Sequence, residues 1–597
     1  MKHAAHSPPR RRDQCSRVFF FVLGTKRLPR RCALLLLIGA AIGFPHPLTA
    51  GSHKEKDKPS AARGNFAPPT FSHSSGCYEA PFELTLRTTL SDAILRFTTD
   101  GSEPTATNGT RYSKPIPLSR TTVLRAATFP ATGAPSEIIS RSFLFPSDLL
   151  RQKGEGFPSF WGIRDREPVR AHYKLDTAIL DEAGGSDAVS RALRSLPVIS
   201  IQANVHDLFD TDRGLYANPM LSGSDWERPG SVELLNTGTQ PGFQIQCGLR
   251  IQGGWNRRPE ECPKHSIRLV FRKKYGAGSL HHPLFGDQMK EFDELILRGG
   301  CNNTWLHWNA DERKRGDYLR DQWMRDSYRE LGHLSARGKF VHLYLNGLYW
   351  GIYNLVERPA GPFIASHLGG KPADYDVRNS DHVLEGDAQA WEALIQLANR
   401  GLQSNEAFQE IQHRLDLPAF IDYMLLNLYG ANADYDRASN WYAARPRSES
   451  GRFVFLVWDG ERTLESATNN AVAYDDDQSP PRLFQKLREN IEFRNRFSAR
   501  AHEVLGSNGV LSAVASSDRY RQLSETLEPA ILLESARWGT YRNEVHPYKV
   551  GPYERYTLKE HWRPEIDRML DQFFPQRTLE FLKQLREAEL LGDSAPK

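Results

Sequence analysis

The sequence predicts an α+β protein in which a small antiparallel β region precedes a larger mixed region that ends in helices. Short alternating apolar runs separated by turn residues fill residues 66–146. Strand-like and helical patterns alternate between residues 196 and 465, and helical apolar periodicity dominates beyond residue 481. Because 597 residues exceed what one hydrophobic core usually organises, we expect two or more domains.

The composition is that of a globular protein, with 39% apolar and 25% charged residues. The formal net charge of +5 is small for this length, and part of it lies in the N-terminal leader. The charge therefore gives no reason to expect a nucleic-acid partner.

The N-terminus predicts export. Basic residues precede the apolar run Cys32–Phe44, and small residues suggest cleavage near Ala50, so residues 1–50 read as a signal peptide. That run is shorter than the ~20 residues needed to span a bilayer, and we expect no membrane span after cleavage. The apolar patch Val18–Leu23 leaves an uncleaved anchor as the alternative. Residues 51–65 are polar and predict a flexible linker.

Four cysteines lie beyond the leader, and their spacing argues against a zinc site because no CxxC pair occurs. Cys247 and Cys262 either form a disulfide across a hairpin or remain buried free thiols. The sequence leaves both alternatives open.

The strand pattern of residues 66–146 includes AILRFTTDG and TVLRAATF, with Asp100–Gly101 as the turn after the first. The segment FTTDGSEPTATNGTRYSKPIPLSRTTVLRAATF resembles the chitobiase/β-hexosaminidase C-terminal module. That resemblance implies an immunoglobulin-like β-sandwich, which would serve as a spacer or bind a surface glycan. Residues 147–195 are expected to connect it to the next domain.

Two predicted hairpins of the larger region carry candidate binding groups. Backbone N–H groups of Gly253–Gly254 and the guanidinium of Arg258 are suited to approach phosphate. Asn346–Gly347 predicts the second hairpin, whose last strand ends at Glu357. Arg298 either lies at a cleft edge or satisfies backbone carbonyls, and Asp321, on a predicted helix, is interpreted as structural.

The strongest candidate site comprises NADYDRASNWYAA (432–444) and FVFLVWDGERTLE (453–465). A helical segment leads into Asp434 and Asn440, and an apolar strand ends on Asp459. A carboxylate, an amide and a second carboxylate at a strand end can orient a nucleophile and bind Mg²⁺. The alternative is a surface hairpin with solvated acids.

These segments resemble the CotH family of atypical secreted protein kinases. Four further segments carry the same resemblance: PKHSIRLVFRKKYG, LILRGGCNNTW, VHLYLNGLYWGIYNLVERP and ESARWGTYRNE. The resemblance implies a protein-kinase-like domain over residues 196–590 that binds ATP and Mg²⁺ or Mn²⁺. It implies Asp434 as general base, with Asn440 and Asp459 as metal ligands. Lys264 would bind phosphate and pair with Glu357. The alternatives are that Lys264 is a solvated lysine at a strand edge and that Glu357 pairs with Arg358 or faces solvent.

Two departures from the family pattern matter. Glu461 replaces the second aspartate of the usual WDxD segment and is expected to serve as a longer metal ligand. Asp436 competes with Asp434 for the role of base, because either precedes Asn440 by a few residues.

The resulting expectation is an exported kinase that phosphorylates Ser or Thr of surface or extracellular proteins. A non-enzymatic surface or matrix protein, with a pseudokinase platform and a glycan-binding sandwich, is the alternative. A glycosidase is a third reading, although no clear pair of catalytic carboxylates can be identified from the sequence.

Overall fold

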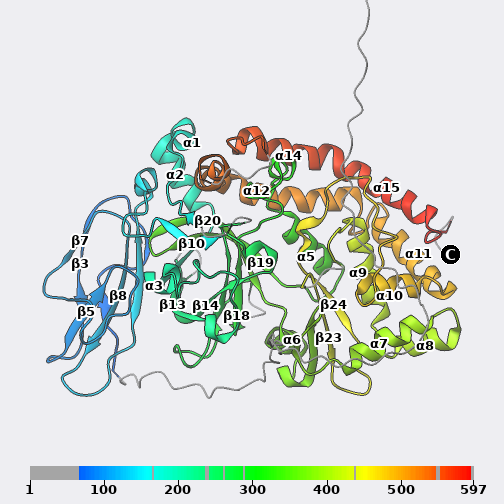
Figure 1. Cartoon of the computed structure of the whole chain (residues 1–597), viewed down its shortest axis with the longest axis horizontal. Coiled ribbons are helices and arrows are strands. Elements are labelled where there is room, and N and C mark those ends of the chain that lie inside the picture. The colour runs from blue at the N-terminus through cyan, green and yellow to red at the C-terminus, as the bar shows by residue number, and fades with distance from the viewer. Residues whose placement is uncertain are drawn as a thin grey trace, which may run out of the picture. The chain divides into compact units, whose positions relative to one another are not determined.

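The computed structural model describes residues 66–164, 167–235, 241–259, 262–286, 290–435, 439–545 and 551–592. Within these ranges the chain has a β-rich N-terminal region, a mixed central part and a helical C-terminal part, as predicted (Figure 1). The expected signal peptide, the linker and Asp436 lie outside the described residues.

The N-terminal region is built from a five-stranded sheet of order β2-β9-β8-β5-β6 and two strand pairs, β1-β4 and β3-β7. Leu124 and Phe143 point from the large sheet into a core that includes Leu84 of β3. The predicted turn follows β5, and Gly101 adopts a φ of 81° there. The strands are β1 (Thr70–Phe71), β2 (Gly76–Cys77), β3 (Phe82–Leu84), β4 (Leu86–Arg87), β5 (Ile94–Thr98), β6 (Thr110–Arg111), β7 (Ile116–Leu118), β8 (Thr122–Phe129) and β9 (Ile139–Leu144).

Connecting elements follow. They are β10 (Phe160–Arg164), β11 (Glu167–Arg170), α1 (Thr177–Glu182) and α2 (Gly185–Arg194). Helix α2 packs against α12 (Ala513–Trp538) of the C-terminal part. The connector is therefore part of the packed structure.

Seven strands then close into a barrel of order β12-β13-β14-β15-β18-β20-β19. Alternate residues such as Ile199 and Leu297 fill its interior, because strand side chains point to opposite faces in turn. Asn346–Gly347 forms the predicted hairpin between the last two strands, with φ values of 47° and 82°. The strands are β12 (Val198–Ala203), β13 (Arg228–Leu234), β14 (Phe243–Gln252), β15 (Ser266–Val270), β18 (Glu294–Arg298), β19 (Gly338–Leu345) and β20 (Leu348–Glu357).

A second sheet of order β22-β21-β23-β24 lies beside the barrel's outer face. Ile296 and Val356 of the barrel share a buried cluster with Tyr442 of the second sheet and with Trp458, which directly follows the last strand of that sheet. The sheet strands are β21 (Tyr375–Asn379), β22 (His382–Glu385), β23 (Trp441–Pro446) and β24 (Val454–Val457). Short elements outside both sheets are α3 (Val205–Phe209), β16 (Leu280–His281), β17 (Glu291–Phe292), α4 (Ala310–Lys314) and α6 (Gly361–Leu368).

Most other elements of the described residues are helices. The predicted helices before the barrel hairpin and before the acidic segment are α5 (Arg320–Glu330) and α9 (Leu417–Tyr429). In Figure 1, α12 runs beside α15 (Phe574–Glu587), and both pack on the core that contains α5 and α9. The remaining helices are α7 (Gln389–Arg400), α8 (Asn405–Gln412), α10 (Pro480–Leu487), α11 (Ile491–Leu505), α13 (Tyr541–Glu544) and α14 (Arg563–Arg568).

The four cysteines of the described part are free thiols, and those at 247, 262 and 301 are buried. Of the two alternatives left by the sequence, the disulfide between Cys247 and Cys262 is therefore not formed. Among the described residues, none of the helices has the length and apolar character that crossing a membrane requires.

Candidate functional site

The two acidic segments of the sequence lie side by side. The loop after α9 carries Asp434, and the turn after β24 carries Asp459. Their backbones bond twice: the Ala433 amide donates to the Arg462 carbonyl at 3.1 Å, and the Leu464 amide donates to Gly430 at 2.8 Å. These two hydrogen bonds hold the loop after α9 against the turn after β24. We call these two segments, which carry Asp434 and Asp459, the acidic edge.

Asp434 is held by neighbours on its own loop. The Asn440 side-chain amide donates to both the carboxylate and the carbonyl oxygen of Asp434, each at 3.0 Å. Buried Asn432 accepts from the Asp434 amide at 3.0 Å. This arrangement orients the Asp434 carboxylate before any substrate arrives.

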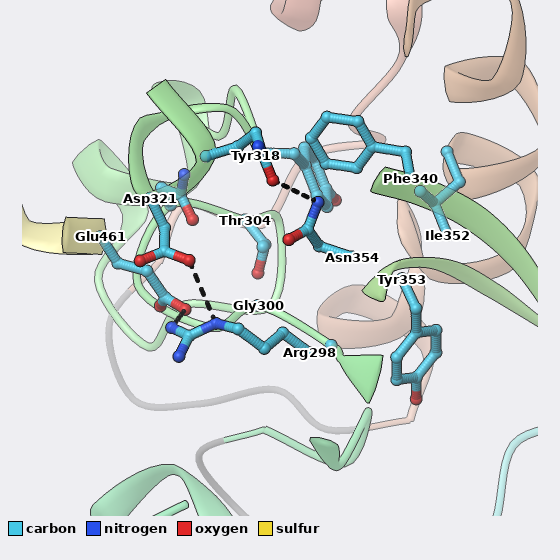
Figure 2. Close-up of a pocket in the computed structure, with 13 residues that line it drawn as sticks. Arg298, Gly300, Thr304, Tyr318, Asp321, Phe340, Ile352, Tyr353, Asn354 and Glu461 are labelled. Carbon is cyan, nitrogen blue, oxygen red and sulfur yellow. Dashed lines mark hydrogen bonds and ion pairs between the residues drawn. The ribbon is translucent and has the colours of Figure 1, made fainter. Parts of the chain in front are cut away.

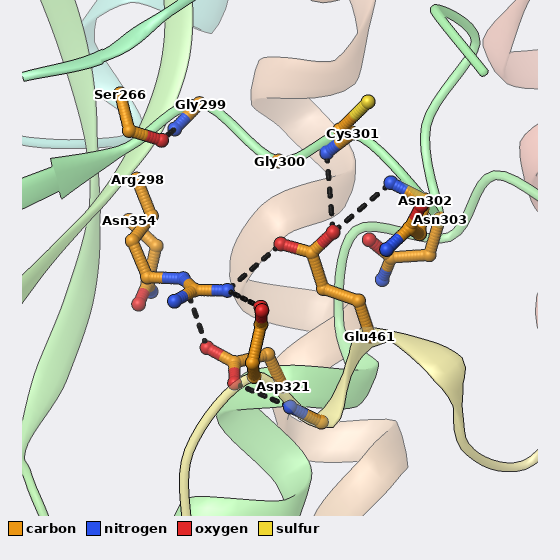
Figure 3. A network of polar contacts seen from close by, with 12 residues as sticks. Ser266, Arg298, Gly299, Gly300, Cys301, Asn302, Asn303, Asp321, Asn354 and Glu461 are labelled. Atoms are coloured by element: carbon orange, nitrogen blue, oxygen red, sulfur yellow. Dashed lines mark hydrogen bonds and ion pairs between the residues drawn. The ribbon is translucent and has the colours of Figure 1, made fainter. Parts of the chain in front are cut away.

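Arg298, at the end of β18, is the centre of the charged network (Figure 3). Its Nη2 donates to Asp459 Oδ1 at 2.6 Å and to Glu461 Oε1 at 2.9 Å. Its Nε lies 3.3 Å from Asp321 Oδ2, at the start of α5. The guanidinium also lies over the Trp458 ring, 4.9 Å from its centroid. One cation therefore connects the barrel, α5 and the acidic edge.

The carboxylates around Arg298 also hold the backbone. Glu461 Oε2 accepts from the amides of Cys301 and Asn302, at 3.3 and 3.0 Å, so that it anchors the turn after β18. Asp321 Oδ1 accepts from the Gly460 amide at 3.0 Å. Asp459 itself adopts a left-handed φ of 59°, a conformation that costs free energy and clusters at functional sites.

Burial and charge oppose each other in this network. Burial alone would lower the pKa of Arg298, but its three carboxylate neighbours raise that pKa above the ordinary value. Burial raises the pKa of Glu461, and Arg298 opposes that rise. Burial would likewise raise the pKa of Asp321, yet Arg298 and Arg325 hold it below its usual range.

A small cavity of about 30 Å³ adjoins this network (Figure 2). Its polar wall includes Arg298, Asp321 and Glu461, and its apolar wall includes Phe340 and Ile352. The volume is that of about one water molecule, so a nucleotide would enter only after side chains move.

A second, larger cavity of about 240 Å³ lies beside the first residue of β18 and the last residue of β20, whereas the small cavity adjoins the last residue of β18. Glu294 and Arg358 line it, together with Phe363 of α6. Arg358 lies within 2.6 Å of Glu294, which partly neutralises the acidic wall.

The predicted phosphate-binding loop is not part of the small cavity. Gly253 and Gly254 are exposed, and Arg258 stacks on the exposed Trp255, 3.5 Å from the ring centroid. Neither glycine lines the cavity around Arg298, and Arg258 does not either. Phosphate binding by this loop stays a prediction.

Lys264 is buried in the barrel and pairs with a different glutamate from the one expected. Its Nζ lies 2.5 Å from Glu534 Oε1 of α12, and both side chains are fully buried. Glu534 Oε2 also accepts from the Ile352 amide at 2.7 Å. Burial lowers the pKa of Lys264, whereas Glu534 raises it.

The predicted pairing of Lys264 with Glu357 is wrong. Glu357 instead accepts from the Arg337 amide at 2.8 Å and lies 3.2 Å from His367. The strand register explains the error, because Glu357 and Leu269 both lie opposite Leu295. Lys264 precedes Leu269 by five residues, or about 16 Å of extended chain.

Removing either charge of the Lys264–Glu534 pair is expected to destabilise the barrel. Lys264→Met leaves a buried carboxylate without its cation, which costs about 3–5 kcal/mol in free energy of unfolding. The double variant Lys264→Met/Glu534→Gln should recover most of that loss. Urea unfolding of the three proteins measures both effects. A single variant that loses less than about 1 kcal/mol would contradict the importance of this pair.

The sequence predicts Arg298 at a cleft edge or on backbone carbonyls and Asp321 as structural, and Arg298 does line the small cavity. The sequence does not predict that the two side chains join one charged network. The available signal was that the β18 segment LILRGG ends in an arginine next to a glycine pair. Across the described ranges, no three His, Cys, Asp or Glu side chains are grouped so that they could hold a metal ion.

Comparisons with known proteins agree with both halves of this architecture. A chitobiase/beta-hexosaminidase C-terminal domain matches residues 73–140. The search of curated proteins found no match. The model of the family described as CotH kinase protein matches residues 249–577, more than half of the chain. The chain therefore belongs to the CotH kinase protein family.

Proposed function

We propose that this protein is an exported kinase that transfers the γ-phosphoryl group of ATP to Ser or Thr hydroxyls of surface or extracellular proteins. The observation that carries the proposal is the joining of Asp434, Asn440 and Asp459 on one acidic edge. Membership in the CotH kinase protein family supports phosphoryl transfer.

The order of elements supports a protein-kinase-like arrangement. A helix, α9, leads to an acid and an asparagine, the hairpin β23–β24 follows, and an aspartate comes directly after it. Protein kinases place a catalytic Asp, an Asn and a second, metal-binding Asp in the same sequence order. Helix α5 follows β18 and α4 in the chain, and its Asp321 lies 3.3 Å from Arg298 at the end of β18.

In this proposal Asp434 accepts the proton of the substrate hydroxyl as its oxygen attacks the γ-phosphorus, and ADP leaves. Asn440 orients Asp434 and, with Asp459, supplies oxygen ligands suited to Mg²⁺ or Mn²⁺. Mg²⁺ usually uses one or two protein carboxylates together with substrate phosphates, so this limited donor set fits. The bound metal would neutralise charge on the phosphates.

Arg298 and Glu461 take supporting roles. Arg298 is suited to bind a phosphate bidentately, because a guanidinium presents parallel N–H donors. Glu461 already bonds Arg298 and two backbone amides, so it holds the turn in place. Its predicted role as a metal ligand would require release of these bonds.

One observation favours the alternative of a non-enzymatic pseudokinase. Arg298 lies against Asp459, the group proposed to bind metal, and the adjoining cavity is only about 30 Å³. If this closed arrangement persisted, the domain would act as a binding platform. Its N-terminal β module would then contact a partner or a surface glycan.

Product analysis distinguishes the two functions. The purified protein is incubated with ATP, Mg²⁺ and a Ser/Thr-rich protein mixture, and mass spectrometry locates new phosphates. The kinase proposal predicts phosphoserine or phosphothreonine and equimolar ADP. Thermal stabilisation by ATP without any phosphorylated product would favour the pseudokinase. The absence of both effects would favour a binding protein.

A further inference from the structure

The barrel has a polar outer face that is buried. Ser200 and Gln202 of β12 and Glu233 of β13 share this face, because the register places Ser200 opposite Glu233. Gln246 of β14 continues the face, opposite Ser231. Each of these side chains is buried. Polar strand faces are normally solvated, so their burial requires a partner surface.

The chitobiase-type module supplies a matching face. Arg125 of β8 lies opposite Ser140 of β9, and Val123 lies opposite Ser142, so these four side chains share one face. Arg125 and both serines are buried. The opposite face of the same strands, with Leu124, forms the module's own core. The module therefore has a separate polar face of its own.

The two faces bond directly. Ser142 Oγ donates to Glu233 Oε2 at 2.7 Å, and it also lies 2.8 Å from Ser200 Oγ. Arg125 Nη2 donates to Gln246 Oε1 at 2.9 Å, and Gln246 Nε2 donates to the module's Ile138 carbonyl at 3.2 Å. These contacts pair Arg125 with Gln246 and Ser142 with Glu233 across the interface, as burial demands, whereas Ser140 Oγ and Gln202 Oε1 have no hydrogen-bond partner among the described residues.

Shape reinforces the match at Gly101. A Cβ atom there would lie 2.3 Å from the Ala203 carbonyl oxygen of β12, so a side chain would push the two surfaces apart. Asn346 bonds that same carbonyl at 2.6 Å. At the edge of the interface, Leu144 of the module joins a buried cluster with Val198 and Tyr344 of the barrel.

We propose that the chitobiase-type module is a fixed structural partner of the barrel, and that module and barrel unfold as one cooperative unit. The partner of this sheet face is thus the protein's own β12–β14 surface, and the face is closed to glycans. This inference is independent of the proposed kinase activity. A module that served only as a tethered spacer would instead unfold independently of the barrel.

Calorimetric unfolding of the full chain tests the proposal with variants on both sides of the interface. Arg125→Met and Gln246→Met should each lower the midpoint of a single transition by several degrees. The double variant should lower it by less than the sum, because the two residues share one interaction. Arg111→Met, on an exposed position of the same sheet, should leave the midpoint unchanged.

Two resolved transitions, of which the module variant moves only one, would overturn the proposal. If Arg125→Met does not fold, Ser142→Ala provides a milder change at the same interface. It should shift the single transition in the same direction. An unchanged midpoint for Ser142→Ala together with Gln246→Met would also overturn the proposal.

The interface should also weaken as the pH rises. Burial raises the pKa of Glu233 to about 7, although Ser75, Ser142 and the Arg141 guanidinium, 3.7 Å away, oppose that rise. Because the pKa of Glu233 is raised in the folded state, its contribution to the free energy of unfolding is complete below the unfolded-state pKa of about 4.5. That contribution is lost as the pH rises through 7. The midpoint advantage of wild type over Glu233→Gln should therefore shrink between pH 5 and 8. An advantage that grew over this range would contradict the account.

Discussion

Asp459→Asn is expected to reduce phosphate transfer by roughly 10²- to 10³-fold, a loss comparable to removing one electrostatic group from a preorganised site. The amide keeps the size of the side chain but loses the negative charge that would bind the metal. Initial rates measured across a range of Mg²⁺ concentrations test this. The variant should require more Mg²⁺ and still fail to reach the wild-type rate.

Asp477→Asn is the matched control, because the Asp477 side chain is almost fully exposed and lies in a loop outside the network. Its rate should equal that of wild type. Full activity of Asp459→Asn at ordinary Mg²⁺ concentrations would exclude Asp459 as a metal ligand. Circular dichroism and a thermal melt of both variants separate a lost charge from a lost fold.

Arg298→Met should have the largest effect on stability in the candidate site. It leaves Asp321 and Glu461 buried without their shared cation, which costs about 3–5 kcal/mol in free energy of unfolding. The same substitution should abolish thermal stabilisation by ATP, because the guanidinium that we propose to bind phosphate is gone. Urea unfolding and nucleotide thermal shifts measure the two losses.

The pH dependence of Arg298→Met gives a second readout. Burial already raises the pKa of Glu461, and loss of the opposing guanidinium raises it further, so protonation of Glu461 favours the folded state as pH falls. The loss in free energy of unfolding relative to wild type should therefore be smaller at pH 5 than at pH 8. Arg414→Met, which breaks an exposed pair with Glu410, should cost about 1 kcal/mol or less. Equal costs for the two variants would contradict a buried network.

The parts of the fold that the sequence predicted are those encoded locally. Asn346–Gly347 specified its hairpin because both residues accept positive φ. The apolar segment before Asp434 became α9, and the run before Asp459 became β24. The order helix, acid, strand pair, acid was therefore readable without any knowledge of tertiary contacts.

The rest depended on contacts between distant segments. The partner of Lys264 lies 270 positions away in α12, and no local pattern relates the two residues. Arg298 gained its role because the end of β18 meets α5 and the turn after β24 at one point. The contact between the module and the barrel could not be predicted from the sequence either. Serines on a strand such as β9 suggest a solvent-facing surface as long as their barrel partners are unknown.

Transfer of label from γ-labelled ATP tests the central claim most directly, with wild type, Asp434→Asn and Asp436→Asn compared under identical Mg²⁺. The account predicts labelled protein with wild type, near-complete loss with Asp434→Asn and retention with Asp436→Asn. α-Labelled ATP should give no incorporation. Undiminished labelling by Asp434→Asn would contradict the assignment of the base, and no labelling by folded wild type would contradict the kinase itself.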